Sequence, residues 1–384
     1  MRIFSATIDR LKIVDNPLRC GHLENALREM GHDVIKFKWN LYFPTKKSRI
    51  EWEKKGKYIK NKQLVEEVQK AHEKKKVDLC ISTGDGSEMC TEAIEKIKAF
   101  GIPTLNFATD DVPESLFEKY YKDIVLVFDY NWTIQRGAFK NYKKIGAKFI
   151  YAPHGADPHL FRPYDCKREF DVTFVGLNCF YRKKLLQIIV DEGIDLHVWG
   201  SGWRRDIWKI AYDVWRDLKF LCKFRDLQNQ KERARQVSEL FWSDIFWYIK
   251  HFNRLKKIFG FTLSIEEMVR MYSRSKISLN FSGTIGPYEK NFCKAVKTIK
   301  GRDIEAPMSG AFYLTEHSDE IAQLYKIGKE IETYRSIPEL VDKIKYYLEN
   351  PAEAEAVRKA GRQRALRDYT WKKCFEQVFN KIGF

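Results

Sequence analysis

The first 39 residues, MRIFSATIDRLKIVDNPLRCGHLENALREMGHDVIKFKW, predict the fold class. Residues 1–7 and 33–39 are strand-like. Between them, Leu18, Leu23 and Leu27 recur at helical spacing before Gly31 ends the pattern. A strand, a helix and a second strand in this order predict a parallel sheet covered by helices.

The same alternation continues to about residue 165. After a basic, Lys-rich connector at 44–62 we expect helices at 63–75 and 88–101. Strands are expected at 77–83, 102–109, 123–129 and 149–155. Residues 1–165 are therefore predicted to form a Rossmann-like, doubly wound domain.

A second cycle follows a polar segment, residues 155–170, in which Pro158 and Pro163 suit a hinge. Strands are expected near 171–178, 196–202, 276–283 and 311–316, with helices between them. We predict a second Rossmann-like domain at 166–365 and a final helix at 366–384 that packs back on the first domain. Ligands are expected in the cleft between the carboxyl ends of the two sheets.

Length and composition agree with two folded domains. The chain has 384 residues, of which 44% are hydrophobic, and a formal net charge of +17. This charge favours polyanionic partners such as nucleic acid, anionic lipid or phosphorylated small molecules. The eight cysteines form no Cys-x-x-Cys pair, and no apolar run of about 18 residues occurs. We expect a cytoplasmic protein, soluble or peripheral on the inner face of the plasma membrane.

Residues 301–320, GRDIEAPMSGAFYLTEHSDE, hold the most informative charged pair. Arg302 and Glu305 are expected on one face of a short helix, at the cleft edge of the second sheet. A guanidinium suits a diphosphate, and a carboxylate can accept two ribose hydroxyl protons. A solvated surface pair is the alternative, since such pairs are common.

Several segments resemble one enzyme family. These are KGRDIEAPMSGAFYLTEHSDEI, DVTFVG, YRKKLL, VWGSGW, MYSRSKISLNFSG, GKEIETYRSIPELVDKIKYYLEN and YAPHGADPHLFRP. Together they resemble the GT-B glycosyltransferases, in the branch of CgeB-like spore-maturation proteins. The resemblance covers most of the second domain, and the first domain only by pattern.

The resemblance implies a GT-B fold in which residues 1–165 are the acceptor domain and residues 166–365 the nucleotide-sugar donor domain. It also implies a UDP-linked donor and no other cofactor. It makes Glu305 the donor-ribose ligand, with Arg302 on the diphosphate, helped by Arg182 or Lys183. Related enzymes often have another Glu eight residues before the ribose Glu, where this chain has Lys297. This departure weakens the transfer of a retaining mechanism.

Other positions at predicted strand ends complete the donor site. At Gly176 and Gly200 the backbone can approach a ligand closely. The alternative is that both are ordinary turn glycines. Asn280 and Glu316 are expected to contact the donor sugar or to support the residues that do.

The reaction needs a group that deprotonates the acceptor hydroxyl. Asp85, between glycines in STGDGSE, is the first candidate base for an inverting reaction, and Asp110 is the second. His154 is the third candidate for contact with substrate, although a structural role beside the hinge is the more common outcome for such a histidine. The sequence has no Asp-x-Asp motif at a strand end and no cluster of His or Cys residues, which are the patterns that would predict a metal site. We therefore expect a metal-independent reaction.

Residues 203–260 form a predicted helical insertion rich in tryptophan. They carry 14 Lys and Arg against 7 Asp and Glu residues, a net charge of +7, and five of the ten tryptophans. Two amphipathic helices here suit an anionic membrane surface, and packing on the chain's own domain or a second subunit is the alternative.

The leading hypothesis is a hexosyltransferase that moves a sugar from a nucleotide sugar to a glycan, lipid-linked or protein acceptor. A sugar-nucleotide epimerase shares the fold and needs no acceptor. A DNA-modifying glycosyltransferase or a nucleic-acid-binding protein is the third class, and the absence of a recognisable nucleic-acid-binding motif argues against it.

Overall fold

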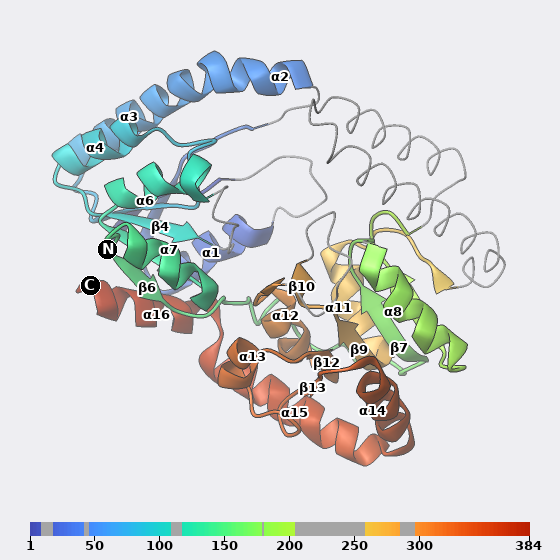
Figure 1. The fold of residues 1–384 in the computed structure, drawn as a ribbon. Helices are drawn as coiled ribbons and strands as arrows, with labels where there is room; N and C mark the ends of the chain where they lie inside the picture. The colour runs from blue at the N-terminus through green and yellow to red at the C-terminus, as the bar shows by residue number, and fades with distance from the viewer. Residues whose placement is uncertain (9–17, 42–45, 109–116, 179, 204–257, 285–295) are drawn as a thin grey trace, which may run out of the picture.

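The structure is a computed structural model that describes residues 1–8, 18–41, 46–108, 117–178, 180–203, 258–284 and 296–384. Two parallel sheets covered by helices form its two lobes (Figure 1). The predicted class, two doubly wound Rossmann-like sheets, is confirmed. The boundary near residue 165 remains a prediction.

The first sheet has six parallel strands in the order β2-β1-β3-β4-β5-β6. The strands are β1 (Arg2–Ala6), β2 (Asp33–Lys36), β3 (Leu79–Ser82), β4 (Thr104–Ala108), β5 (Tyr130–Thr133) and β6 (Phe149–Tyr151). Strand β1 illustrates why both faces are covered. Its neighbouring residues Ile3 and Phe4 point to opposite faces, and both are buried in separate apolar cores.

Helices from distant parts of the chain cover the two faces of this sheet. Helices α3 (Lys57–Lys74), α4 (Thr91–Ala99) and α6 (Lys122–Val127) contribute to the core that holds Phe4. On the other face, α1 (Leu18–Glu29) packs beside α16 (Trp371–Ile382), the last helix of the chain (Figure 1). The remaining described helices of this lobe are α2 (Lys46–Glu51), η1 (Trp52–Gly56), η2 (Phe117–Tyr121), η3 (Arg136–Ala138) and α7 (Phe139–Lys144).

Two local predictions in this lobe are wrong. Residues 123–129, expected as a strand, lie mostly in helix α6, and strand β5 follows at Tyr130–Thr133. The run DIVLVFD has the β-branched composition of a strand, but as a helix it buries Ile124 and Val125 against the lobe. The Lys-rich segment expected as a connector is helical from Lys46, because Trp52, Asn61 and Leu64 find contacts with the lobe.

The second sheet has five parallel strands in the order β13-β12-β9-β7-β8. They are β7 (Phe170–Val175), β8 (Leu196–Trp199), β9 (Ser275–Asn280), β12 (Tyr313–Glu316) and β13 (Glu332–Tyr334). A small antiparallel pair, β10 (Gly283–Thr284) and β11 (Val296–Lys297), lies outside this sheet. The helices are α8 (Phe180–Asp191), α11 (Ile265–Arg274), α12 (Arg302–Met308), α13 (Asp319–Leu324), α14 (Ile337–Glu349) and α15 (Pro351–Asp368).

Two described hydrogen-bonded contacts link one lobe to the other near the ends of their strands. The side-chain amide of Gln135, which follows β5, donates to the Ile299 carbonyl at 2.8 Å and accepts from the Ile299 N–H at 3.2 Å. The Arg136 N–H donates to a Glu320 carboxylate oxygen at 2.8 Å. Polar groups that follow β5 are thereby held against the segment that leads into α12 and against the first turn of α13.

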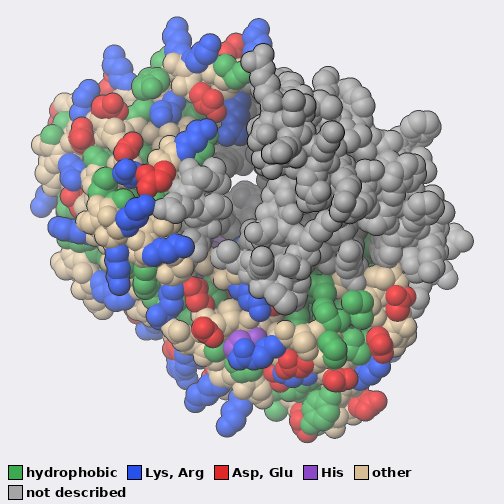
Figure 2. Space-filling model, in the orientation of Figure 1, with side chains coloured by type: hydrophobic (Ala, Val, Ile, Leu, Met, Phe, Trp, Pro, Cys, Tyr) green, Lys and Arg blue, Asp and Glu red, His purple; other side chains and the backbone are tan. Residues whose placement is uncertain are grey.

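Charged side chains are spread over both lobes in the view of Figure 2. Lys and Arg are interspersed there with Asp and Glu over the described surface, without a continuous basic stripe on this face. No helix in the described ranges has the length and apolarity needed to cross a membrane. The insertion 203–260, apart from Trp203 and residues 258–260, lies outside the described residues, so its predicted membrane role is untested.

Candidate functional site

The first turn of α12 carries the two charged residues that the sequence singles out. Gly301 begins this turn, and its carbonyl accepts the Glu305 N–H at 2.9 Å. A methyl group in place of the Gly301 hydrogen would lie only 2.8 Å from Glu305 Oε1. The Glu305 carboxylate therefore folds back over the start of its own helix, and a glycine at 301 leaves the space for it.

The Arg302 guanidinium lies against the turn that follows β7. A methyl group on Gly176 would come within 3.0 Å of Arg302 Nη1. Gly176 is itself held in place, because its N–H donates to the Trp199 carbonyl at 2.8 Å and its carbonyl accepts from Trp203 Nε1 at 2.5 Å. A cation is thus placed beside the backbone turn at the carboxyl end of a parallel strand, where open α/β sheets bind ligands.

The turn after β8 packs on the same backbone. Gly200 has φ of 139°, and a methyl group on it would lie 2.1 Å from the Gly176 carbonyl oxygen. Only glycine accommodates this close approach of two turns. The structure therefore brings Gly176, Gly200 and Arg302 together, and it shows a packing reason for the glycine at 200.

A second guanidinium joins the ends of β7 and β9. Arg182, on the first turn of α8, donates to the Leu177 carbonyl at 3.0 Å and to the Phe281 carbonyl at 3.2 Å. It also lies over the Phe174 ring, 5.4 Å from the ring centroid. The side chain of Lys183 lies outside the described residues, so of the predicted pair only Arg182 is placed.

A buried polar network beneath α12 holds the helix to the sheet. The Asp303 carboxylate, 1% exposed, accepts hydrogen bonds from the Lys300 N–H at 2.6 Å and the Tyr313 hydroxyl at 2.7 Å. Asn280 Nδ2 lies 3.4 Å from Asp303 Oδ1 and 3.2 Å from Thr315 Oγ1. Burial raises the pKa of Asp303 to about 6, although these hydrogen bonds oppose the shift.

Tyr272 of α11 lies beside the charged pair. Its phenol is buried, which raises its pKa above the ordinary value, and the charges of Arg302 and Glu305 act on it in opposite directions. An aromatic ring from a neighbouring helix thus forms part of the surroundings in which Arg302 and Glu305 are held.

The end of β12 presents a different group of side chains. Glu316 is 1% exposed at the last position of this strand. The next residue, His317, accepts from Arg335 Nη2 at Nε2, at 2.6 Å, and its Nδ1 lies 3.1 Å from Thr333 Oγ1. Because a guanidinium can only donate, His317 Nε2 must be the acceptor, so Nδ1 carries the proton. Lys297, eight residues before Glu305, donates to the His317 carbonyl at 2.8 Å.

Two candidate catalytic residues of the first lobe, Asp85 and His154, lie in different local environments. Asp85 follows β3, and its Oδ1 accepts the Ser87 N–H at 2.7 Å within a tight turn. His154 is 3% exposed and packs between aromatic rings, 4.8 Å from Trp371 and 6.5 Å from Phe107 between ring centroids. This packing favours the structural role for His154. Asp110 lies outside the described residues.

The sequence of this chain is similar to that of a known protein family. A family model described as glycosyl transferase-like matches residues 182–380, more than half of the chain. The chain belongs to this glycosyl transferase-like family. The match includes Arg182, Arg302 and Glu305. No curated protein matches the sequence significantly.

Solved structures similar to this glycosyl transferase-like chain match it over its whole length. Sucrose-phosphate synthase from Thermosynechococcus elongatus is 13% identical, covers 100% of this chain and 99% of its own, and has a TM-score of 0.59. HepE from Anabaena, solved in complex with UDP, is 11% identical with the same coverage and a TM-score of 0.57. An alpha-glucosyltransferase in complex with UDP and a 13-mer DNA is 12% identical, again with the same coverage, and has a TM-score of 0.59.

The prediction of a glycosyltransferase with a GT-B fold is therefore confirmed at the level of family and fold. The contacts described above also group five of the predicted donor-site residues of this family member: Gly176, Gly200, Arg302, Glu305 and Asn280. Asp303 and Tyr272, which complete that group, were not singled out from the sequence. The available signal for Asp303 was its place one residue after Arg302, about 100° further around the same helical turn.

The described residues of this family member hold no group of three or more His, Cys, Asp or Glu side chains placed to bind a metal ion. The guanidinium groups of Arg302 and Arg182 lie at the turn after β7 in the candidate donor site.

Proposed function

We propose that this glycosyltransferase transfers a sugar from a nucleotide-sugar donor, a UDP-sugar, to a glycan, lipid-linked or protein acceptor without a metal ion. One observation carries the proposal. The Arg302 guanidinium lies against the Gly176 turn while Glu305 follows one helical turn later. A diphosphate bound beside the Gly176 turn and a ribose bound beside Glu305 would both contact the first turn of α12.

The chemistry of each group suits its proposed ligand. Glu305 accepts two ribose hydroxyl protons, and Arg302 with Arg182 faces the diphosphate. Negative charge grows on the diphosphate as the glycosidic bond breaks, so fixed guanidinium groups stabilise the transition state more than the ground state. Asp85 is proposed as the base that takes the acceptor proton in an inverting reaction, with Asp110 as the second candidate.

The solved relatives support a UDP-linked donor. HepE from Anabaena has been solved with UDP and with UDP-glucose. We also propose that the chain belongs to the CgeB-like branch, on the motifs quoted above, and that residues 203–260 hold it at an anionic membrane surface on the cytoplasmic side.

A thermal-shift panel of UDP, UDP-glucose, UDP-galactose, ADP-glucose and GDP-mannose tests the donor site. We expect the wild type to be stabilised by UDP and at least one UDP-sugar. Glu305→Ala should bind about 10- to 100-fold more weakly, because it removes the ribose acceptor. Glu349→Ala, an exposed position on α14, is the matched control and should respond as the wild type does. A wild type that responds to no nucleotide would contradict the donor-site assignment.

Product analysis separates the transferase from an epimerase of the same fold. A transferase given UDP-sugar and acceptor releases UDP and a glycosylated acceptor. An epimerase converts the nucleotide sugar without any acceptor.

A further inference from the structure

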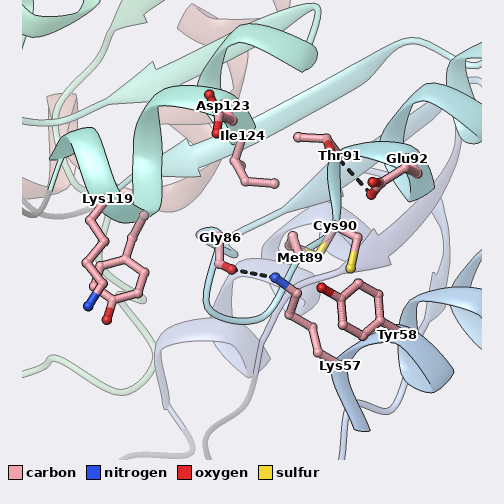
Figure 3. Close-up of a pocket in the computed structure, with 11 residues that line it drawn as sticks. Lys57, Tyr58, Gly86, Met89, Cys90, Thr91, Glu92, Lys119, Asp123 and Ile124 are labelled. Atoms are coloured by element: carbon pink, nitrogen blue, oxygen red, sulfur yellow. Dashed lines mark hydrogen bonds between the residues drawn. The ribbon is translucent and has the colours of Figure 1, made fainter. Parts of the chain in front are cut away.

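A pocket in the first lobe lies outside the donor site described above. It has a volume of about 260 Å³ and is formed by three segments (Figure 3). Lys57 and Tyr58 begin α3, Gly86 to Glu92 lead from β3 into the first turn of α4, and Lys119 to Ile124 lie in η2 and α6. The Gly86 segment comes directly after the carboxyl end of β3, and ligands of parallel α/β sheets bind at this edge.

Hydrogen bonds on several sides hold the Gly86 loop that lines the pocket. Lys57 Nζ donates to the Gly86 carbonyl at 2.8 Å, as Figure 3 shows, and the Gly86 N–H donates to the Tyr120 carbonyl at 2.6 Å. A methyl group on Gly86 would lie 2.6 Å from the same Tyr120 oxygen, so glycine is required at this contact. Asn61 secures the far side of the loop, donating to the Glu88 carbonyl and accepting the Cys90 N–H. A loop bound at each side is preorganised for a ligand.

The charges that line the pocket balance one another. Its two cations, Lys57 and Lys119, are matched by two carboxylates, Glu92 and Asp123. Lys57 already donates to a carbonyl, and Lys119 lies 4.7 Å from the centroid of the Tyr120 ring. An anionic ligand would meet both carboxylates without a net positive field, so the lining favours a neutral, polar ligand.

The remaining lining suits the two sides of a sugar ring. Tyr58 presents an aromatic ring at the rim, with 57% of the residue exposed. An exposed ring of this kind can cover the C–H face of a pyranose. Glu92 and Asp123 can accept hydroxyl protons, and so can the oxygen of Thr91, whose own hydroxyl donates to a Glu92 carboxylate oxygen at 3.4 Å. The volume is slightly below the range of about 300–1,000 Å³ that accommodates a drug-sized ligand, and so suits a unit the size of a single sugar.

We infer that this pocket binds a neutral saccharide unit, the terminal sugar of a glycan acceptor. The assignment of this sugar as acceptor rests on the proposed function. It narrows the acceptor classes to glycans, whether free or attached to another molecule. Asp85, the proposed base, directly precedes the lining residue Gly86 in the chain.

Saturation-transfer NMR on the full chain tests the pocket without any donor. The probes are methyl α-D-glucopyranoside, methyl β-D-galactopyranoside and methyl α-D-mannopyranoside. We expect transfer to at least one glycoside. Tyr58→Ala and Glu92→Gln should each weaken its binding at least about tenfold, since each removes one side of the contact. Tyr346→Ala on α14 and Glu95→Gln on α4 are matched controls that should leave binding unchanged.

Three results would overturn the inference. These are no transfer to any of the glycosides, transfer that survives both pocket variants, and tighter binding of glucose 6-phosphate than of the methyl glucoside. Far-UV circular dichroism of each variant ensures that lost binding is not lost folding.

The result is separable from the proposed function. Glu305→Ala should keep the glycoside signal while losing the nucleotide response. A wild type that binds glycoside but no nucleotide would overturn the donor-site assignment and support the pocket assignment. A wild type that binds nucleotide but no glycoside would overturn the pocket assignment alone.

Discussion

At the scale of single residues, the buried carboxylate of Asp303 explains how α12 keeps its position. Arg302 and Glu305 belong to the candidate donor site, while Asp303 between them turns inward and ties the helix to Lys300 and Tyr313. Its burial makes the charged form costly, which is why its pKa rises to about 6 from an ordinary value of 3.8.

Asp303→Asn should change the dependence of stability on pH. Between about pH 4 and pH 6 the native Asp303 retains a proton that the unfolded chain has lost, so the wild type loses stability as pH rises through this window. The loss is about 1.4 kcal/mol per pH unit, or roughly 3 kcal/mol in all. The variant lacks this ionisation, and its free energy of unfolding should fall less steeply.

Urea titrations at pH 4.5, 5.5, 6.5 and 7.5 check this expectation. Asp342→Asn, an exposed position on α14, is the control and should follow the wild-type profile. Parallel profiles for wild type and Asp303→Asn would show that Asp303 is ionised throughout.

At the scale of elements, the start of helix α11 is determined by residues close to it in the sequence. Ser264 accepts the Glu267 N–H, and the Glu267 carboxylate accepts the Ser264 N–H at 2.7 Å, which forms a capping box. This helix presents Tyr272 to the candidate donor site, so its first turn supports the site from a distance.

Ser264→Ala should destabilise the second lobe by about 1 kcal/mol, because the first-turn N–H of Glu267 loses its acceptor. Ser264→Asn retains a capping oxygen and should stay close to the wild type. Thermal unfolding of the three proteins measures the difference. An equal loss in both variants would mean that the cap is not the cause.

Element identity was less predictable where local composition and tertiary contacts disagree. The run at 123–129 has strand-like residues and is nevertheless mostly helical, because Ile124 and Val125 of α6 are each buried in an apolar cluster, Ile124 with Phe4 and Val125 with Phe117. Propensity is a weak preference that packing overrides. The helix that begins at Lys46 was not predicted for the same reason. Most of its residues are charged, and the contacts that hold it to the lobe come from a few apolar residues such as Trp52.

At the scale of the whole molecule, the two lobes are joined by more than the connecting segment. Helix α16 is the last element of the chain, yet its apolar face lies in the core of the first sheet with Leu23, Ile81 and Trp132. The ring of Phe375 lies 5.4 Å from that of Trp132, centroid to centroid, and the residue is fully buried.

Phe375→Ala should therefore destabilise the first lobe, although residue 375 follows the second lobe in sequence. We expect a loss of about 3–5 kcal/mol, from lost burial and the cavity left behind. Hydrogen exchange should show the largest loss of protection in strands β5 and β6. Phe384→Ala, which is 41% exposed in the wild type, should change stability by less than about 0.5 kcal/mol. Loss of protection confined to the second sheet would contradict this role of α16.

The sequence alone determined the two doubly wound sheets and the helical placement of Arg302 and Glu305, because these depend on periodicity within short windows. It also indicated the family. Only the tertiary structure decided that Arg302 meets Gly176 and that Asp303 and Tyr272 support the same group. It also decided that the start of α3, the Gly86 loop and the η2–α6 segment line one pocket of about 260 Å³. Such contacts join residues far apart in the chain. Their formation depends on which strands become neighbours and on the packing between lobes, and no local pattern records either.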